Sequence, residues 1–329
     1  MTLPPRRFLH LAAGTIGLSA LPRFARAQAY PSRPITLIVP FTAGGPVDTL
    51  ARILTERMRP LLGQPVIIEN VGGAGGSIGV GRVARAAPDG YTLINGIWST
   101  HVVNGAIYSL QYDVLNDFEP VALLTSNSQM IAGRKGLPAN DLKEFIAWLK
   151  ANPDKATAGT AGVGSPQHVF GVMFQKATGT RFQFSHYRGG VLATQDLMAG
   201  QIDLVIADLV TALPQIRGGT VKGFAFTGTS RLPAAPGVPT ADEAGLPGFH
   251  TSVWNAIWAP KGTPKDIVAR LNAAIVEAFA DPAMRARLTD LGQQPVPPDQ
   301  HSPEVLRALH KAEIEKWWPI IKAANIRSE

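Results

Sequence analysis

Two glycine-containing turns in this sequence could bind an anion. The first turn, residues 41–45, follows a strand-like run and precedes a predicted helix over 47–62 with apolar residues at helical spacing. Its two glycines let the backbone bend with exposed N–H groups, and Pro46 suits the first helical position. The free N–H groups of the first helical turn, with the positive end of the helix dipole, would attract a carboxylate or a phosphate. An ordinary strand-to-helix turn remains an alternative interpretation.

The second turn, residues 161–165, repeats this arrangement. It follows a predicted strand over 156–159, and Ser165 and Pro166 are suited to the N-cap and first position of a helix over 167–178. The two turns are far apart in the sequence, so we expect them to belong to different domains. Facing each other across a cleft, they would hold a carboxylate from both sides.

A hydrolase with Ser165 as nucleophile and His168 as base is the enzymatic alternative. The nucleophile elbow needs Gly-x-Ser-x-Gly, whereas residues 162–166 read Gly-Val-Gly-Ser-Pro. Ser165 is also suited to capping a helix, and no acidic residue that would orient His168 is evident. The glycine-rich run 71–79 does not complete a dinucleotide-binding fingerprint either. We therefore expect no enzyme and no cofactor.

The remaining polar residues give weaker signals. The histidines have no metal-ligand spacing, and the chain has no cysteine, which excludes thiolate catalysis and disulfides. We therefore expect no metal site. Asp208 follows a predicted strand over 202–206, at an end where ligand sites gather in α/β sheets, but it could equally cap a following helix.

Composition and the N-terminus indicate an exported globular protein. The 329 residues are 45% hydrophobic and 17% charged, with 33 glycines and 27 prolines. Arg6 and Arg7, the apolar run 8–21 and small residues before Ala27 or Ala29 predict a signal peptide over 1–27, with the export route open. Its removal leaves 27 basic and 24 acidic residues, a net charge near +3. We see no basic stripe and expect no nucleic-acid partner.

Strand-like and helix-like runs alternate, which predicts an α/β fold with largely parallel sheets. The predicted strands are 35–40, 66–69, 91–95, 121–131, 156–159, 182–186, 202–206, 221–227 and 253–259. The predicted helices are 47–62, 78–86, 142–150, 167–178, 191–199, 264–280, 282–291 and 303–324.

A series of short motifs carries a family resemblance over about residues 30–324. In order, the motifs are Pro40-Phe41-x-x-Gly44-Gly45-x-x-Asp48, Gly72-Gly73-Ala74-Gly75-Gly76, Pro88-Asp89-Gly90-Tyr91, Gly164-Ser165-x-x-His168, Tyr187-Arg188-Gly189-Gly190, Pro239-Thr240-x-x-Glu243-Ala244-Gly245 and Ala259-Pro260-x-Gly262-Thr263-Pro264. Together they resemble the extracytoplasmic solute receptors of tripartite tricarboxylate transporters, the Bug-type receptors.

The resemblance implies a type II periplasmic binding protein with a ligand cleft between two lobes. Lobe 1 would be built from 28–126 and 252–329 and lobe 2 from 127–251, with crossovers near 125–129 and 250–254. The ligand would be a small organic carboxylate: a di- or tricarboxylate, an acidic amino acid or an aromatic acid. The implied partners are the membrane permease subunits of a tripartite transporter, or a membrane kinase if the protein serves sensing, and the implied state is a periplasmic monomer.

The resemblance also implies a set of ligand-binding residues. Backbone amides of the two turns would hold one carboxylate, and Trp98 with His101 could shape a pocket for an aromatic acid. The expected ligand-binding residues are Phe41, Thr42, Ala43, Gly44, Gly45, Asp48, Trp98, Ser99, Gly164, Ser165, His168 and Asp208.

Overall fold

The computed structural model describes residues 30–327, of which residues 31–327 belong to one compact unit. The predicted signal peptide over 1–27 lies outside the described residues. In the part of the chain that is described, no helix has the length and apolar character needed to cross a membrane.

Nine strands of the described residues form the sheet, in the order β2-β1-β3-β9-β4-β7-β5-β6, with β8 also paired to β4. The strands lie close to the predicted runs, but β4 is much longer than predicted because it continues through both halves of the sheet. Their bounds are β1 Ile35–Val39, β2 Val66–Asn70, β3 Thr92–Ile97, β4 Phe118–Arg134, β5 Thr157–Thr160, β6 Gln183–His186, β7 Leu204–Asp208, β8 Val221–Phe226 and β9 Ser252–Pro260.

The sheet consists of two five-stranded sets with the same order. In each set, three parallel strands are followed by two strands that pair antiparallel: β2-β1-β3-β9-β4 in one set and β6-β5-β7-β4-β8 in the other. The prediction of largely parallel sheets is therefore wrong, because β4 and β9 bring antiparallel pairings into both sets. The fold class itself, an α/β type II periplasmic binding protein, is confirmed by its structural neighbours, which are described below.

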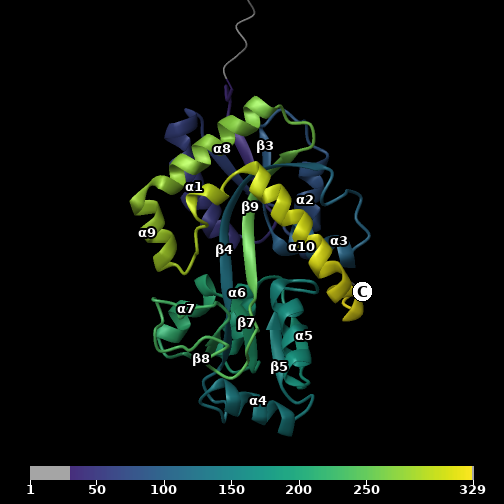
Figure 1. Cartoon of the computed structure of the whole chain (residues 1–329), viewed down its shortest axis with the longest axis vertical. Helices are drawn as coiled ribbons and strands as arrows, with labels where there is room; N and C mark the ends of the chain where they lie inside the picture. The colour runs from purple at the N-terminus through teal and green to yellow at the C-terminus, as the bar shows by residue number, and fades with distance from the viewer. Residues whose placement is uncertain (1–29, 328–329) are drawn as a thin grey trace, which may run out of the picture. The chain divides into compact units, whose positions relative to one another are not determined.

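Strand β4 joins the two sets (Figure 1). Up to Ser128 it pairs with β9, and from Gln129 it pairs with β7. This change of partner falls in the segment where a crossover was expected. The lobe boundaries at 126/127 and 251/252 stay a prediction.

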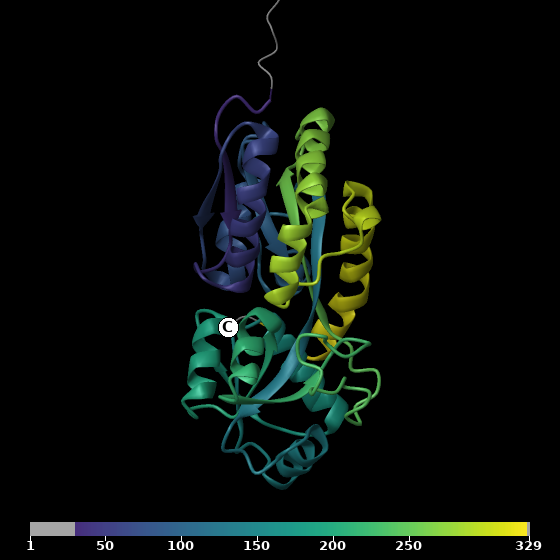
Figure 2. The ribbon, with the colours of Figure 1, turned by 90° about the vertical axis from the view of Figure 1, so that its left-hand side faces the viewer.

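Helices cover the faces of both sets (Figures 1 and 2). Polar N-caps and prolines in the first turn begin several of them, as at Ser165-Pro166, Asp281-Pro282 and Ser302-Pro303. The α-helices are α1 Pro46–Leu62, α2 Ser77–Ala84, α3 Asn104–Ile107, α4 Leu142–Ala151, α5 Pro166–Thr178, α6 Gly190–Met198, α7 Leu209–Arg217, α8 Lys265–Ala280, α9 Pro282–Asp290 and α10 Pro303–Ala323. Short 3₁₀ turns lie at η1 Ala74–Gly76 and η3 Pro298–Gln300, and η2 Ser99–Val103 is a π-helical turn.

The glycine-rich run after β2 serves close backbone packing. Gly72 lies against the backbone of Phe41 and Thr42, and a Cβ atom on Gly79 would approach the backbone of Pro40. Val71 donates a backbone hydrogen bond to Val39 at 2.9 Å. This run therefore supports the turn 41–45 from behind.

Candidate functional site

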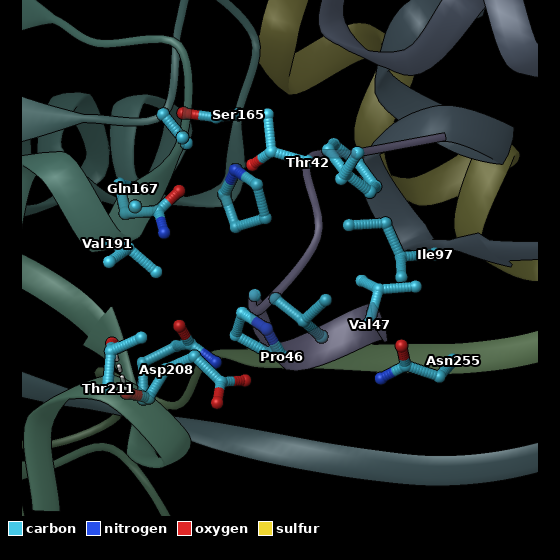
Figure 3. Close-up of a pocket in the computed structure, with 18 residues that line it drawn as sticks. Thr42, Pro46, Val47, Ile97, Ser165, Gln167, Val191, Asp208, Thr211 and Asn255 are labelled. Carbon is cyan, nitrogen blue, oxygen red and sulfur yellow. Dashed lines mark hydrogen bonds between the residues drawn. The ribbon is translucent and has the colours of Figure 1, made fainter. Parts of the chain in front are cut away.

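A cavity of about 90 Å³ lies where the two glycine turns approach each other. Its volume is enough for several water molecules or a small organic molecule. Figure 3 shows Thr42 and Ser165 on one side of the cavity, and Asp208 with Thr211 on the other. The lining residues are Phe41, Thr42, Gly45, Pro46, Val47, Ile97, Gln129, Ala161, Ser165, Pro166, Gln167, Gly189, Gly190, Val191, Asp208, Thr211, Val253 and Asn255.

The N-termini of four helices meet at this cavity. Gly45, Ser165, Gly189 and Asp208 are the N-cap residues of α1, α5, α6 and α7, and all four line the wall. The first N–H groups of a helix have no partner within the helix, and the helix dipole makes this end positive.

Three of these helices present free donors at the cavity. Among the described residues, the N–H groups of Val47, Gln167 and Val191 have no hydrogen-bond partner. All three residues line the wall. The arrangement can therefore bind an anion through backbone donors alone.

The turn 41–45 is held in shape by Asp48. The carboxylate of Asp48 accepts hydrogen bonds from Gly44 N at 2.8 Å, from Arg52 Nε at 2.8 Å and from Asn70 Nδ2 at 3.0 Å. Burial raises the pKa of Asp48, but these hydrogen bonds together outweigh it and hold the pKa below its usual value. Asp48 is 1% exposed and does not line the cavity, so the structure gives it a role in positioning the turn.

The second turn is held by its own helix. Ser165 Oγ accepts a hydrogen bond from His168 N at 3.4 Å, as an N-cap does, and His168 Nδ1 accepts one from Gly164 N at 3.1 Å. The His168 ring meets Phe184 and His186 edge to face, and burial with the nearby His186 lowers its pKa to about 4. His168 and Gly164 therefore lie behind the turn and are not part of the cavity wall.

Trp98 and Ser99 lie in the interior and do not line the cavity. The Trp98 ring stacks on Phe170 at 5.1 Å between ring centroids and meets Trp317 at 4.9 Å. His101 is fully buried and stacks on Trp258 at 3.8 Å. Both rings therefore pack against other aromatic side chains in the core. The expectation that Trp98 and His101 shape a pocket for an aromatic acid does not match this geometry.

Asp208 is the one ionisable side chain among the described residues that line the cavity. Its Oδ1 accepts a hydrogen bond from Val210 N at 2.8 Å, so it also caps α7. Burial raises the pKa of Asp208 to about 6, which exceeds the opposing effect of that hydrogen bond.

Of the expected ligand-binding residues, the structure brings five to the cavity wall: Phe41, Thr42, Gly45, Ser165 and Asp208. The other seven lie behind or beside it: Ala43, Gly44, Asp48, Trp98, Ser99, Gly164 and His168.

Comparison with known proteins places the chain in a family. Residues 50–326 match the family described as "Tripartite tricarboxylate transporter family receptor". The chain belongs to this receptor family. Its relatives include a UPF0065 protein in the TAR-I ttuE-ttuC' intergenic region of Agrobacterium vitis, 40% identical over 93% of this chain and 88% of that protein.

Solved structures agree with this assignment. The periplasmic binding protein BugD has a TM-score of 0.86 and 38% identity, covering 91% of this chain and all of that one. MatC from Rhodopseudomonas palustris, solved with bound malate, has a TM-score of 0.84 and 41% identity, covering 89% of this chain and all of that one. The resemblance to Bug-type receptors is thus confirmed, and these proteins are solute receptors of the periplasm, not enzymes.

The geometry around Ser165 agrees with a receptor. His168 Nδ1 is bonded to a backbone N–H and not to Ser165 Oγ. Ser165 Oγ in turn accepts from the backbone, as a helix cap does. The arrangement of nucleophile and base that a serine hydrolase needs is therefore not present at this pair.

Several wall residues of the receptor were not predicted. Gln129, Val253 and Asn255 lie on β4 and β9, within or next to the segments where crossovers were expected. Gly189 and Gly190 belong to a motif that was noted only for the resemblance. The signal that could have found them is their position: a residue at a crossover between two lobes must lie next to the cleft.

Proposed function

We propose that this receptor binds a small organic carboxylate in the cavity described above and delivers it to the membrane subunits of a tripartite transporter. The convergence of four helix N-termini on one cavity carries the proposal. A carboxylate there would receive hydrogen bonds from backbone N–H groups and a favourable dipole interaction. The malate bound to MatC supports the same class of ligand.

The wall also suits a charged ligand that must later be released. Among the described residues that line it, no lysine, arginine or histidine is present. Backbone dipoles can therefore bind the anion without forming a buried ion pair with a charged side chain. We propose that the two predicted lobes close on the ligand and reopen at the transporter. Such closure requires only that the ligand bind the closed form more tightly than the open form.

A thermal-shift screen of the ligand-stripped mature protein against mono-, di-, tri- and aromatic carboxylates tests the binding step. A ligand at about 100 times its dissociation constant adds roughly 2.7 kcal/mol to the free energy of unfolding. We expect a clear rise in Tm with one class of acid and no chemical conversion of it. A screen in which no acid raises the Tm would contradict the proposal.

The neighbouring residues Val191 and Leu192 give a matched pair of variants. Val191 lines the cavity at the N-terminus of α6, whereas Leu192 is 47% exposed and does not line it. Val191→Asp places a carboxylate where we expect the ligand carboxylate, so it should abolish binding by like-charge repulsion. Leu192→Asp should bind as the wild type does. Equal binding by both variants would mean that the ligand lies elsewhere.

Delivery is tested separately. A strain without this chain should lose uptake of the acid found in the screen, and uptake should return with the wild type but not with Val191→Asp. Unchanged uptake in the deletion strain would favour a sensing role. We expect the mature protein to elute as a monomer with and without ligand.

A further inference from the structure

A buried row of polar side chains connects the segment 293–294 to the cavity wall. Its members Gln293, Asn127, Thr125 and Asn255 are each at most 4% exposed. Thr125 on β4 lies directly opposite Asn255 on β9 in the strand register. Asn255 lines the cavity, whereas the other three residues do not. The row therefore links one wall side chain to side chains outside the wall.

The amide of Asn127 has only one possible orientation. Its Oδ1 accepts a hydrogen bond from Gln294 N at 2.8 Å, and a backbone N–H group can only donate. The Nδ2 group of Asn127 therefore lies on the other side, where it donates to Gln293 Oε1 at 2.7 Å and to Thr125 Oγ1 at 3.2 Å. The hydroxyl oxygen of Thr125 is thus an acceptor for Asn127.

In the amide orientation of the structure, Asn255 leaves two groups without partners. Its Nδ2 donates to Thr125 Oγ1 at 3.1 Å, so this hydroxyl oxygen accepts two hydrogen bonds. Thr125 is fully buried, and its own hydroxyl proton has no acceptor among the described residues. Asn255 Oδ1 is also buried and has no partner among them. Each unpaired buried polar group is a cost to the fold.

The opposite orientation of the Asn255 amide pairs both groups. The oxygen and nitrogen of an amide are assigned from their hydrogen-bond partners, and a half-turn of the amide exchanges them. Asn255 Oδ1 then accepts the hydroxyl proton of Thr125, and Asn127 Nδ2 still donates to the hydroxyl oxygen. Of Thr125 and Asn255, only the N–H groups of Asn255 then need a partner, and a ligand oxygen in the cavity can accept from them. In the first orientation no ligand could pair the Thr125 proton, because Thr125 is buried and does not line the cavity.

We propose that Asn255 turns its Nδ2 group towards the cavity, and that Thr125 is the positioning residue that imposes this orientation. The assignment rests on the proposed function and adds a side-chain donor to its binding site. Figure 3 shows Val47 and Asn255 on the same side of the cavity. The N–H group of Val47 has no hydrogen-bond partner among the described residues. A carboxylate here would receive hydrogen bonds from both residues, whereas an amide oxygen at this point would repel it.

Neutron diffraction from ligand-free crystals soaked in heavy water tests the orientation directly, because it locates deuterium atoms. We expect the deuterium atoms of the Asn255 amide on the atom that faces away from Thr125, and the hydroxyl deuterium of Thr125 directed at Asn255. Deuterium atoms on the amide atom that faces Thr125 would overturn the proposal. The measurement needs no ligand, so its result is independent of the proposed function.

The affinity of the mature protein for an acid tests the role of Thr125. The probe is whichever of malate, succinate, adipate and benzoate raises the Tm most, and its affinity is measured by titration calorimetry. Thr125→Val removes the hydroxyl group with little change of shape. We expect the affinity to fall about tenfold, because the buried Asn255 oxygen loses its donor and the amide is no longer held in place. Thr125→Ser should restore most of the affinity.

The alternative orientation predicts the opposite sign. If Thr125 held the oxygen of Asn255 towards the cavity, Thr125→Val would release the amide to turn its N–H groups to the anion. The affinity of this variant would then equal or exceed that of the wild type.

Two further variants test whether Thr125 has a merely structural effect. In the Asn255→Ala background, Thr125→Val should not change the affinity further, because Thr125 acts only through Asn255. Thr263→Val is the matched control, since Thr263 is also buried and its hydroxyl group donates to Pro260 O at 2.7 Å, but it does not line the cavity. This control should lose stability and keep the affinity of the wild type.

The outcomes separate this inference from the proposed function. If none of the four acids raises the Tm, the proposed function fails for them, and the deuterium positions still support or overturn the orientation of Asn255. Three results would each overturn the positioning role of Thr125: wild-type affinity of Thr125→Val, an equal loss in Thr125→Ser, or the same loss with and without the Asn255 side chain.

Discussion

Gly164 and Ile107 are packed so closely that a Cβ atom on Gly164 would collide with the Cδ1 atom of Ile107. Gly164 precedes α5, and Ile107 ends α3, so this contact fixes the turn 161–165 against the segment that follows β3. Gly164 also has φ +75°, which an L-residue with a side chain adopts at a cost. Glycine is therefore needed here for two separate reasons.

Gly164→Ala should lower the free energy of unfolding by about 2–4 kcal/mol, from backbone strain and overpacking together. It should also weaken ligand binding, because Ser165 is displaced with the turn. Adding Ile107→Ala should restore part of the loss, with a coupling energy of about 1 kcal/mol or more in a double-mutant cycle measured by urea denaturation.

The control for this cycle is Gly179→Ala. Gly179 has φ +65° but nothing within 4 Å of an added Cβ atom, so only the strain remains and the cost should be about 1 kcal/mol. Strict additivity of Gly164→Ala and Ile107→Ala would show that the close contact has no energetic effect.

Ser165→Ala should lower stability by about 1 kcal/mol through loss of the α5 cap. It should also weaken ligand binding several-fold, because Ser165 lines the cavity. Asp141→Ala removes the corresponding cap of α4 at a similar cost in stability, away from the cavity. Calorimetric titration of both variants should show reduced affinity only for Ser165→Ala; an equal effect in both would mean that Ser165 acts through stability alone.

The sequence pattern was sufficient for most of the elements. All nine strands and the eight predicted helices have counterparts, since apolar periodicity, proline at N1 and polar caps are local signals. Helix α7 was missed because Pro214 lies inside it and argues against a helix. Asp208 did prove to be a helix cap, which was one of the two interpretations left open.

The π-helical turn η2 could not be predicted because distant residues hold it. Trp318 Nε1 donates to Val102 O at 2.9 Å, and His310 Nε2 lies 2.6 Å from His101 O. Both partners are on α10, more than 200 residues away in the sequence. A local pattern carries no information about such contacts.

The cavity was predicted only in part for a related reason. The motif residues that were singled out belong to the two turns, and some of them, such as Asp48 and His168, support a turn from behind. Spacing in the sequence does not distinguish a residue that contacts the ligand from a residue that only holds the contacting residue in place. The strand residues Gln129 and Asn255 reach the cavity only because β4 and β9 pass through that point.

Asp48→Asn should destabilise the fold by about 1–3 kcal/mol at pH 7, because the buried carboxylate accepts charge-assisted hydrogen bonds from Gly44, Arg52 and Asn70. The folded-state pKa of Asp48 is lowered, so its contribution is present above the unfolded pKa and is lost as the pH falls through the folded value. The difference from the wild type should therefore shrink below about pH 4.

Chemical denaturation between pH 3 and pH 7 measures this difference. Glu56→Gln is the matched control, because Glu56 pairs with Arg287 on the surface and the pair is more than half exposed. Its loss should cost less than about 1 kcal/mol. A cost for Asp48→Asn no larger than that of Glu56→Gln would show that the turn does not depend on the Asp48 carboxylate.

His310 should make the fold less stable in acid. Its ring is 3% exposed between His101, Trp254 and Trp258, and burial lowers its pKa to about 4 despite the hydrogen bond to His101 O. The unfolded chain takes up a proton near pH 6.5 and the folded one does not, so stability is lost as the pH falls from about 6.5 towards 4. The shift corresponds to a loss on the order of 3 kcal/mol over this range.

His310→Gln removes the titration and keeps an N–H donor for His101 O. The free energy of unfolding of this variant, measured by denaturation at pH 7, 6, 5 and 4.5, should fall less steeply with decreasing pH than that of the wild type. His250→Gln is the control, since His250 is exposed and pairs with Asp242. Since His168 and His301 are also partly buried with lowered pKa values, a reduced slope is expected for His310→Gln and not a flat one. An unchanged slope would mean that His310 is protonated in the fold at pH 5 and is compensated by its neighbours.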